Sequence, residues 1–288
     1  MGNVKMRVWD VKHGNAIYIR TPNEKHIVID LGVGDYSEGV DDRSPLETLA
    51  NHYKIGKIDY LIITHPHKDH IKDILNLDKL NLGPRILNRP KSFDVNSLLN
   101  GASAADKPLF QKYIDLHNSY NTPLSANEII STPENYGGLK IDFFANGAED
   151  DNNLNNHSKI TVIKYAGTKI VIPGDNEYKS LDGLMRLTSF KNAIADCDIL
   201  IAPHHGRESA YHTEFVSHCN PRLTIISDGS ICDTSANSKY SAATKRGWEI
   251  LERGTWKKRY LLTTNTDGEV YIDFGTGTTK PYMKVEVK

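Results

Sequence analysis

The sequence predicts an α/β protein in which two β-sheets are covered by helices. Two observations favour this class. Short β-rich runs recur in both halves of the 288-residue chain, and segments with helical character lie between them. Several runs alternate polar and apolar residues, as half-buried antiparallel strands do, whereas DYLII (59–63) and DILIA (198–202) are continuously apolar, as fully buried strands are.

Each predicted element has its own signal. Ser44-Pro45-Leu46-Glu47 predicts a helix that runs to about Lys54, with Ser as N-cap, Pro at the first helical position and Glu reaching back from the third. Further helices are predicted at 70–80, 107–120, 177–190, 209–218 and 239–251. Strands are predicted at 4–9, 15–20, 26–30, 59–64, 139–144, 159–165, 168–173, 198–203, 222–227, 260–264 and 268–274.

The chain is long enough for one large domain or two small ones. It contains no internal repeat and no low-complexity linker, so a single domain spanning 1–288 is predicted. Residues 88–135 are the least strand-like part. They form either a surface insertion or lid, or a packed helix with loops.

The composition, 39% hydrophobic and 25% charged, is typical of a soluble globular protein. No apolar stretch approaches the roughly 20 residues of a membrane span, and the N-terminus has no apolar signal region. Cys197, Cys219 and Cys232 share no ligand spacing and are expected to be reduced thiols. A cytoplasmic protein without a membrane partner is therefore expected.

The formal net charge of −1 bears on nucleic-acid binding, because proteins that bind long nucleic acids by charge usually carry a basic excess. Such binding would have to rest on local basic clusters, which are otherwise solvated faces. The candidates are the 85–91 cluster (Arg85, Arg89 and Lys91) and the 257–259 cluster (Lys257, Lys258 and Arg259).

Three polar loops follow apolar strands. ITHPHKDH (63–70) places three histidines and an aspartate within six positions, and imidazole and carboxylate groups are common metal ligands. Gly174-Asp175-Asn176-Glu177 follows TKIVIP, and His204-His205-Gly206 follows DILIAP. Each of the last two could be a simple turn or helix cap. Because a rigid sheet can hold a site at its strand ends, the three loops together predict a metal site.

The sequence resembles the metallo-β-lactamase fold superfamily. His65-Pro66-His67-Lys68-Asp69-His70 matches its HxHxDH motif, and HIVIDLG (26–32) and IPGDNE (172–177) resemble further landmarks in order. APHHGRES (202–209), WDVKHGNAIYI (9–19) and NNHSKITVIKYAGTKIVIPGD (155–175) are similar to the branch related to the ComEC/Rec2 DNA-uptake proteins. The resemblance extends to about residue 230. It implies a four-layer αββα sandwich of two mixed sheets with helices outside.

The resemblance also implies a site for two divalent metal ions, with Zn²⁺ first and Mn²⁺ as the alternative. In the implied ligand set, His65 and His67 hold one metal, Asp69 and His70 hold the second, Asp175 bridges both, and His204 joins the second metal. His205 is the alternative ligand or a proton donor. His157 is a candidate for the first metal, with Asn153 and Asn155 as alternatives.

The sequence departs from the superfamily pattern at two places. After HxHxDH, relatives usually have an apolar residue and two glycines, whereas Ile71 is followed here by Lys72 and Asp73. Relatives of the ComEC type carry an Asn-x-x-x-His-Pro segment where this chain has ISDGSICDTSANSKYS (226–241). The residues there are either polar substrate contacts or turn residues that cap the following helix: Asp228, Ser230, Asn237 and Tyr240.

Paired divalent metals lower the pKa of a bridging water and stabilise attacking and leaving oxygens together, which suits phosphodiesters. Asp69 and Asp175 would orient the resulting hydroxide, and His204 or His205 would protonate the leaving oxygen. The resemblance thus implies a metal-dependent phosphodiesterase or nuclease acting on nucleic acid, DNA in the first place.

Two alternatives remain open at this point. The near-neutral charge favours a hydrolase of a small molecule, such as a cyclic nucleotide, another phosphodiester, a lactone or a thioester. The Asn-rich segment 152–156 and the missing glycines suggest a metal-binding sensor module with little activity. The sequence does not predict an oligomeric state.

Overall fold

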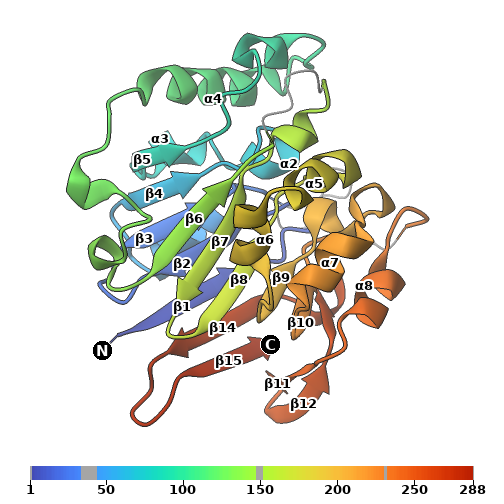
Figure 1. The fold of residues 1–288 in the computed structure, drawn as a ribbon. Helices are drawn as coiled ribbons and strands as arrows, with labels where there is room; N and C mark the ends of the chain where they lie inside the picture. Colours follow the sequence, from blue (N-terminus) through green and yellow to red (C-terminus); the bar gives the residue numbers. More distant parts are fainter. Residues whose placement is uncertain (1, 34–43, 147–151, 230–231, 288) are drawn as a thin grey trace.

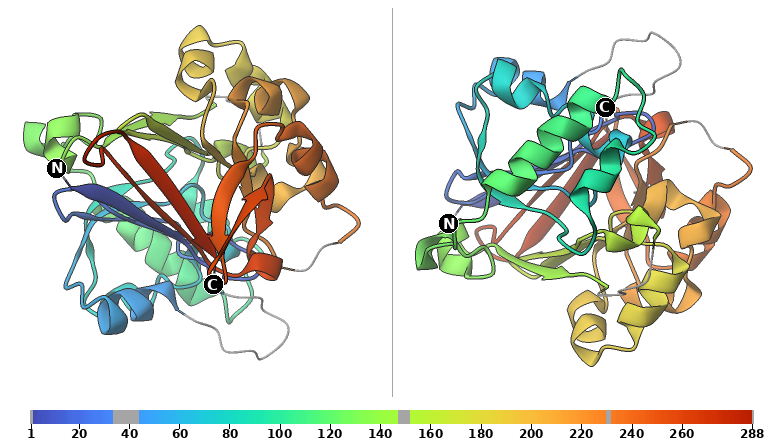
Figure 2. Two further views of the ribbon diagram at one scale, coloured as in Figure 1. Left: turned by 90° about the horizontal axis from the view of Figure 1, so that it is seen from below. Right: turned by 90° about the horizontal axis from the view of Figure 1, so that it is seen from above.

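The computed structural model describes residues 2–33, 44–146, 152–229 and 232–287. Two β-sheets pack face to face, and helices cover both outer faces (Figure 1). Seen from above and below, α4 lies on one side of the paired sheets, whereas α5 and α6 lie on the other (Figure 2). The predicted four-layer αββα sandwich is therefore confirmed.

The larger sheet has the strand order β12-β11-β15-β14-β1-β2-β3-β4-β5. It is mixed, because β1, β2 and β3 pair antiparallel whereas β3, β4 and β5 pair parallel. Its strands are β1 (Asn3–Val8), β2 (Ile17–Arg20), β3 (His26–Ile29), β4 (Ile58–Ile62), β5 (Pro84–Asn88), β11 (Trp248–Glu252), β12 (Thr255–Arg259), β14 (Val270–Gly275) and β15 (Tyr282–Val287).

The smaller sheet has the order β13-β10-β9-β8-β7-β6. β6, β7 and β8 pair antiparallel, and β8, β9, β10 and β13 pair parallel. Its strands are β6 (Lys140–Phe144), β7 (Ile160–Tyr165), β8 (Thr168–Ile172), β9 (Ile199–Ile201), β10 (Leu223–Ile226) and β13 (Leu261–Thr263).

The helices lie in the connections between strands. They are α1 (Pro45–Glu47), α2 (Lys68–Ile71), α3 (Asn76–Lys79), α4 (Lys107–Ser119), α5 (Tyr178–Met185), α6 (Thr188–Ile194), α7 (Thr213–Cys219), α8 (Asn237–Ala243) and α9 (Thr264–Asp267). Among the described residues, no helix is both long and apolar enough to cross a membrane.

The main core lies between the two sheets. Alternate residues of facing strands fill it, such as Val4, Met6 and Val8 of β1 and Ile170 and Ile172 of β8. Each fully buried aliphatic side chain of this kind contributes about 1.5–3 kcal/mol through its removal from water. Separate apolar clusters join each sheet to its helices. The packing of the two sheets therefore does not depend on the loops at their edges, and the sheets hold these loops in place.

The predicted helix at 239–251 is wrong in its second half. α8 ends at Ala243, and Trp248–Glu252 forms strand β11 instead. The C-cap Thr244 has left the helical conformation, with ψ of 87°, and Gly247, with φ of 69°, turns the chain before WEILE pairs with β12. The predicted helix at 177–190 is divided into α5 and α6, and that at 70–80 into α2 and α3.

The segment 88–135 contains α4, which contributes Leu109, Tyr113 and Ile114 to the apolar cluster under the larger sheet. α4 is thus part of the helical layer that covers this sheet. That 1–288 is a single domain, and that part of 88–135 closes over a substrate, stay predictions.

Candidate metal centre

The three polar loops meet at one edge of the sandwich. The HxHxDH loop follows β4, the GDNE loop follows β8 and the HHG loop follows β9, each at the carboxyl end of its strand. β8 and β9 run parallel, so their carboxyl ends lie side by side. A tight group results, the four-residue cluster of Asp69, His70, Asp175 and His205, whose ligand atoms all lie within 4.8 Å of one another.

Asp175 lies at the middle of the four-residue cluster. Its Oδ1 is 3.2 Å from His70 Nε2, and its Oδ2 is 3.3 Å from His205 Nε2. Asp69 Oδ2 is 3.0 Å from His205 Nε2, and the two imidazole Nε2 atoms are 3.3 Å apart. Four ligand atoms thus face one small volume, as residues around a metal ion do.

A buried acceptor fixes each imidazole of the cluster from behind. His70 Nδ1 is 2.8 Å from Asp30 Oδ2, and His205 Nδ1 is 2.8 Å from the carbonyl oxygen of Ser227. Because an acceptor faces Nδ1, the Nδ1 hydrogen is donated there, and Nε2 is left with the lone pair that a metal needs. Both rings are therefore oriented as metal ligands.

Asp30 and Ser227 are supporting residues that sequence reasoning missed. Asp30 is fully buried and also accepts hydrogen bonds from the backbone and hydroxyl of Thr64, each 2.7 Å long. Asp30 ends the apolar strand in HIVIDLG, but that motif does not show that its carboxylate faces His70. Ser227 acts through its backbone carbonyl, which leaves no mark in the sequence.

The charges of the cluster are strongly coupled. Burial lowers the pKa of His205, but Asp175 and Asp69 outweigh it and raise this pKa to about 10. Burial likewise opposes the carboxylates around His70, which raise its pKa well above the usual value. Burial raises the pKa of Asp175 and Asp69, but the neighbouring imidazoles outweigh it and lower both. Without a metal ion, protons on the imidazoles thus offset the negative charge of the carboxylates. A bound divalent cation would offset that charge instead.

The donor set is consistent with the implied metals. Two imidazole nitrogens and two carboxylates suit Zn²⁺, Mn²⁺ or Fe, and carboxylate-anchored imidazoles are usual around such ions. The residues present therefore fit a divalent metal ion.

His65, His67 and His157 make up what we term the His65 side. His65 Nε2 lies 3.0 Å from His67 Nδ1 and 3.8 Å from Asp175 Oδ2, and the His65 ring centroid lies 4.2 Å from that of His70, so this side adjoins the cluster. Burial lowers the pKa of both His65 and His67. His157 Nδ1 lies 2.6 Å from the hydroxyl of Ser92, and His157 is not among the four cluster residues.

The structure places His205, rather than His204, in the four-residue cluster. His204 lies at the rim: its Nδ1 is 3.1 Å from Glu177 Oε1 and its Nε2 is 3.9 Å from Asp175 Oδ2. Both residues have left-handed backbone conformations, with φ of 47° and 52°. Such conformations are costly for residues with a Cβ and concentrate at functional sites. Here they turn the His205 ring inward.

The turn that carries Asp175 requires a glycine. Gly174 has φ of 61°, and a Cβ there would lie 2.9 Å from Ser158 Cβ and 3.0 Å from Thr64 Cβ. The Asp175 N–H donates to Ser158 Oγ at 3.1 Å, and the His204 N–H donates to the Gly174 carbonyl at 3.1 Å. The GDNE loop is therefore locked to both neighbouring loops.

The Asn-rich segment and the departure after HxHxDH have structural roles. Asn153 and Asn155 donate to the Glu177 carboxylate at 2.9 and 3.1 Å, which holds that side chain beside His204. The buried carboxylate of Asp73 accepts from Ser44 Oγ at 2.7 Å and from the Leu46 N–H at 2.9 Å. Asp73 thus fixes the start of α1, where Ser44 is the N-cap as predicted.

The candidate substrate contacts after β10 have separate surroundings. Asp228 is buried and pairs with Arg207 at 3.1 Å. Tyr240 is fully buried within α8, and Asn237 begins that helix. Ser230 lies outside the described residues. Of the described candidates, Asp228 is therefore the one beside the site.

Part of each basic cluster has acidic or backbone partners. Arg85 pairs with Glu128 at 3.0 Å, and Arg89 is buried against backbone carbonyls. In the second cluster, Lys257 and Arg259 pair with Glu252 at 2.8 and 2.7 Å. These contacts favour the interpretation that the two basic clusters are solvated faces over the interpretation that they bind nucleic acid.

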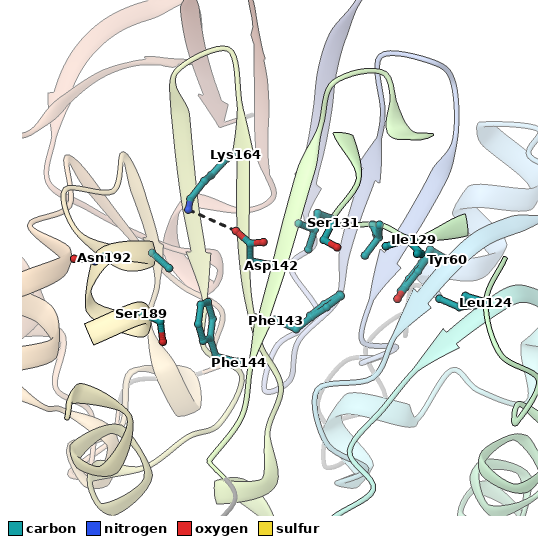
Figure 3. A pocket seen from close by; sticks show the side chains of 13 residues that line it. Tyr60, Leu124, Ile129, Ser131, Asp142, Phe143, Phe144, Lys164, Ser189 and Asn192 are labelled. Carbon is teal, nitrogen blue, oxygen red and sulfur yellow. Dashed lines mark ion pairs between the residues drawn. The ribbon is translucent and has the colours of Figure 1, made fainter. Parts of the chain in front are cut away.

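A cavity of about 680 Å³ lies elsewhere, beside β6 and α6 (Figure 3). Phe143, Phe144 and Leu124 line it together with an ion pair, 3.6 Å long, between Asp142 and Lys164. None of the four cluster residues lines it. Although this cavity is large, it is separate from the candidate metal centre.

The cluster at the strand ends of this α/β sandwich consists of residue types that bind metal ions. Residues 9–91 match the family model of the Metallo-beta-lactamase superfamily. No curated protein gives a significant match.

The solved structures that are similar to this chain have low sequence identity to it. A variant of CmlA β-hydroxylase is 12% identical over 91% of this chain and 52% of that chain, with a TM-score of 0.50. CmlA itself, a diiron β-hydroxylase from Streptomyces venezuelae, is 16% identical over 78% and 45%, with a TM-score of 0.45. Unliganded yeast PDE1 is 11% identical over 82% and 91%, also with a TM-score of 0.45. The chain spans about half the length of the CmlA structures.

Proposed function

We propose that this protein is a metal-dependent hydrolase of phosphodiester bonds, with nucleic acid as the first substrate to test. The observation that carries the proposal is the four-residue cluster, in which two anchored imidazoles and two carboxylates face one volume. The superfamily is one of dimetal enzymes. Two bound divalent ions would supply an activated water and neutralise charge on the electrophile.

The residues of this chain have separate parts in the proposed reaction. His70, His205, Asp69 and Asp175 bind the metal ions, with Asp175 positioned to contact both sides. His65 and His67 complete the other side, and burial keeps both rings neutral at physiological pH. His204, held by Glu177 at the rim, is placed to contact a substrate or leaving-group oxygen.

Lys159 follows the Asn-rich segment and precedes β7. Burial, and to a smaller extent the charge of Lys91, lowers the pKa of Lys159. The Lys159 N–H donates to the carbonyl of Thr64, the residue before His65, at 3.0 Å. Lys159 therefore belongs to the strand start that adjoins the metal loop, where a phosphate would need positive charge.

A small phosphodiester is the second candidate, because acidic side chains pair with part of each described basic cluster and the net charge is −1. The sensor hypothesis rested on the Asn-rich segment and on the missing glycines after HxHxDH. The hydrogen bonds of Asn153, Asn155 and Asp73 give both features a structural role and so weaken that hypothesis. The resemblance to the ComEC/Rec2-related branch remains the support for DNA.

The test compares three substrates with the full chain loaded with Mn²⁺ or Zn²⁺: a labelled oligonucleotide, a cyclic nucleotide and bis-p-nitrophenyl phosphate. Chelator-sensitive turnover of any one supports the proposal, and the oligonucleotide separates nuclease from small-molecule activity. Asp175→Asn should lower kcat/KM by on the order of a thousand-fold, about 4 kcal/mol of transition-state stabilisation. Asp182→Asn is the matched control, because Asp182 is partly exposed on α5 and pairs with Arg186. Metal binding without turnover of any phosphodiester would contradict the proposal.

A further inference from the structure

A third imidazole reaches the four-residue cluster from the solvent side. His13, in the loop between β1 and β2, has its Nε2 3.6 Å from Asp69 Oδ2. Its ring packs on that of His205, with centroids 4.5 Å apart. The His13 side chain is 35% exposed, whereas those of His70 and His205 are buried. His13 therefore lies where the cluster opens to solvent.

Asp228 determines the orientation of the His13 ring. Asp228 Oδ1 lies 2.9 Å from His13 Nδ1 and also accepts from Arg207 Nη2 at 3.1 Å and from the Gly229 N–H at 2.8 Å. His13 Nδ1 also lies 3.3 Å from Arg207 Nη2, but the buried carboxylate is the nearer partner. When His13 Nδ1 donates to this carboxylate, the lone pair of the neutral ring lies on Nε2. That lone pair is on the ring atom nearest Asp69.

This arrangement repeats the one seen at the two cluster imidazoles. His70 has Asp30 behind Nδ1, His205 has the Ser227 carbonyl, and His13 has Asp228. Ligand atoms about 2.0–2.2 Å from one metal in a tetrahedral arrangement lie roughly 3.4 Å apart. The 3.6 Å between His13 Nε2 and Asp69 Oδ2 fits two ligands of one ion.

The loop that carries His13 is fixed against the site. The Asn15 N–H donates to the Asp69 carbonyl at 3.3 Å, and the Ser227 hydroxyl donates to the Gly14 carbonyl at 2.8 Å. Gly14 has φ of 148°, and a Cβ there would lie 2.6 Å from the Asp69 carbonyl oxygen. The approach of this loop to Asp69 is thus set by the packed backbone.

We propose that His13 is a further ligand of the metal centre, whose Nε2 joins Asp69 and His205 on one metal ion at the solvent side. The inference rests on the proposed metal-dependent function, since the imidazole needs a bound ion. His13 stands outside the four-residue cluster because it approaches from the Asp69 side alone. Asp228 and Arg207 are positioning residues for it.

The test uses metal-free full-length protein titrated with Zn²⁺ against a chromophoric chelator, and with Co²⁺ to record its visible absorption. His13→Ala should weaken one of the bound metals by about tenfold or more and change the Co²⁺ spectrum. Asp228→Asn should shift both readouts in the same direction by less. His52→Ala is the matched control, because His52 is exposed at the end of the helical segment Thr48–His52 and should change neither.

The outcomes separate this inference from the proposed function. Unchanged metal affinity and an unchanged Co²⁺ spectrum in His13→Ala would overturn it, even if activity fell. Wild-type protein that binds no metal would overturn the metal centre itself. Circular dichroism of the metal-free variants checks that an altered affinity does not arise from misfolding, and His13→Gln gives a second variant if His13→Ala fails to fold.

Discussion

The two sides of the candidate metal centre are built differently. In the four-residue cluster, His70 and His205 each have Nδ1 held at 2.8 Å by a buried acceptor, Asp30 for one and the Ser227 carbonyl for the other. These rings can turn little without breaking a buried hydrogen bond, which is costly. This part of the site is therefore preorganised to receive an ion.

On the His65 side, two imidazoles face each other instead. His65 Nε2 and His67 Nδ1 lie 3.0 Å apart, and His157 is held by the hydroxyl of Ser92. A neutral ring can exchange such a contact for a metal bond at little cost. The ligand motif alone therefore does not determine the affinity for a metal ion. The residues that hydrogen-bond to the ligands determine how rigidly the ligands are held. We expect the cluster to bind its metal more tightly.

The largest effect expected is at the histidine pair. His205→Ala removes a cluster ligand and should lower the affinity for the tighter metal by about 100-fold, whereas His204→Ala should leave the metal content unchanged, because His204 lies at the rim. Elemental analysis after dialysis against a weak chelator measures both. Equal losses in the two variants would contradict the assignment of His205 to the cluster.

The next comparison concerns the supporting residues. Asp30→Asn weakens the acceptor behind His70 and should reduce the affinity for the tighter metal by about 10–100-fold. Ser92→Ala removes the hydroxyl beside His157 and should change the tighter affinity less than about threefold. Isothermal titration of each variant with Zn²⁺ gives the values. A greater loss of metal affinity in Ser92→Ala than in Asp30→Asn would contradict the conclusion that the cluster is the tighter side.

The two sides should also differ in their pH dependence. The carboxylates raise the pKa of His205 to about 10 and that of His70 well above its usual value, so both rings hold protons at pH 7 that a metal must displace. Affinity at the cluster should therefore rise with pH, by about tenfold per pH unit for each proton displaced. Titrations in buffers with different ionisation enthalpies count these protons. Metal binding without proton release at pH 7 would contradict the charge balance.

The smallest effect concerns Asp73, behind the metal loop. Burial raises its pKa to about 6, so the folded state binds this proton more readily than the unfolded chain. Its contribution to stability is then greatest below the unfolded pKa and falls as pH rises through about 6. Asp73→Asn should match the wild-type Tm at pH 5 and exceed it by a few degrees at pH 8. Thermal melts of the metal-free proteins test this, and an equal Tm difference at both pH values would contradict it.

The sequence was sufficient to predict the loops that meet at the site. HxHxDH, GDNE and HHG carry the side-chain types that bind metals, and each follows an apolar strand. The choice between His204 and His205 could not be predicted, because it depends on two left-handed backbone conformations. Ser227 acts through a carbonyl common to every residue. His13 was in a quoted motif, but its distance to Asp69 depends on how a separate loop packs.

For the fold, the strands at the centre of each sheet were predictable, whereas β12, β11 and β15 at one edge of the larger sheet and β5 at its other edge were not. Continuous or alternating apolar runs predicted β4 and β9. β12, Thr255–Arg259, is almost wholly exposed and lacks an apolar face, so periodicity gives no signal for it. WEILE could pair as β11 or continue a helix, and the sequence does not show that the chain leaves the helical conformation at Thr244 and turns at Gly247.

The central claim is that the four-residue cluster binds a divalent metal, and anomalous X-ray scattering tests it most directly. Crystals of protein purified without added metal, and then of protein soaked in Zn²⁺, would be measured on both sides of the zinc absorption edge. We expect an anomalous peak enclosed by Asp69, His70, Asp175 and His205, with a weaker second peak toward His65 and His67. A well-ordered site without a peak in the soaked crystals would contradict the account.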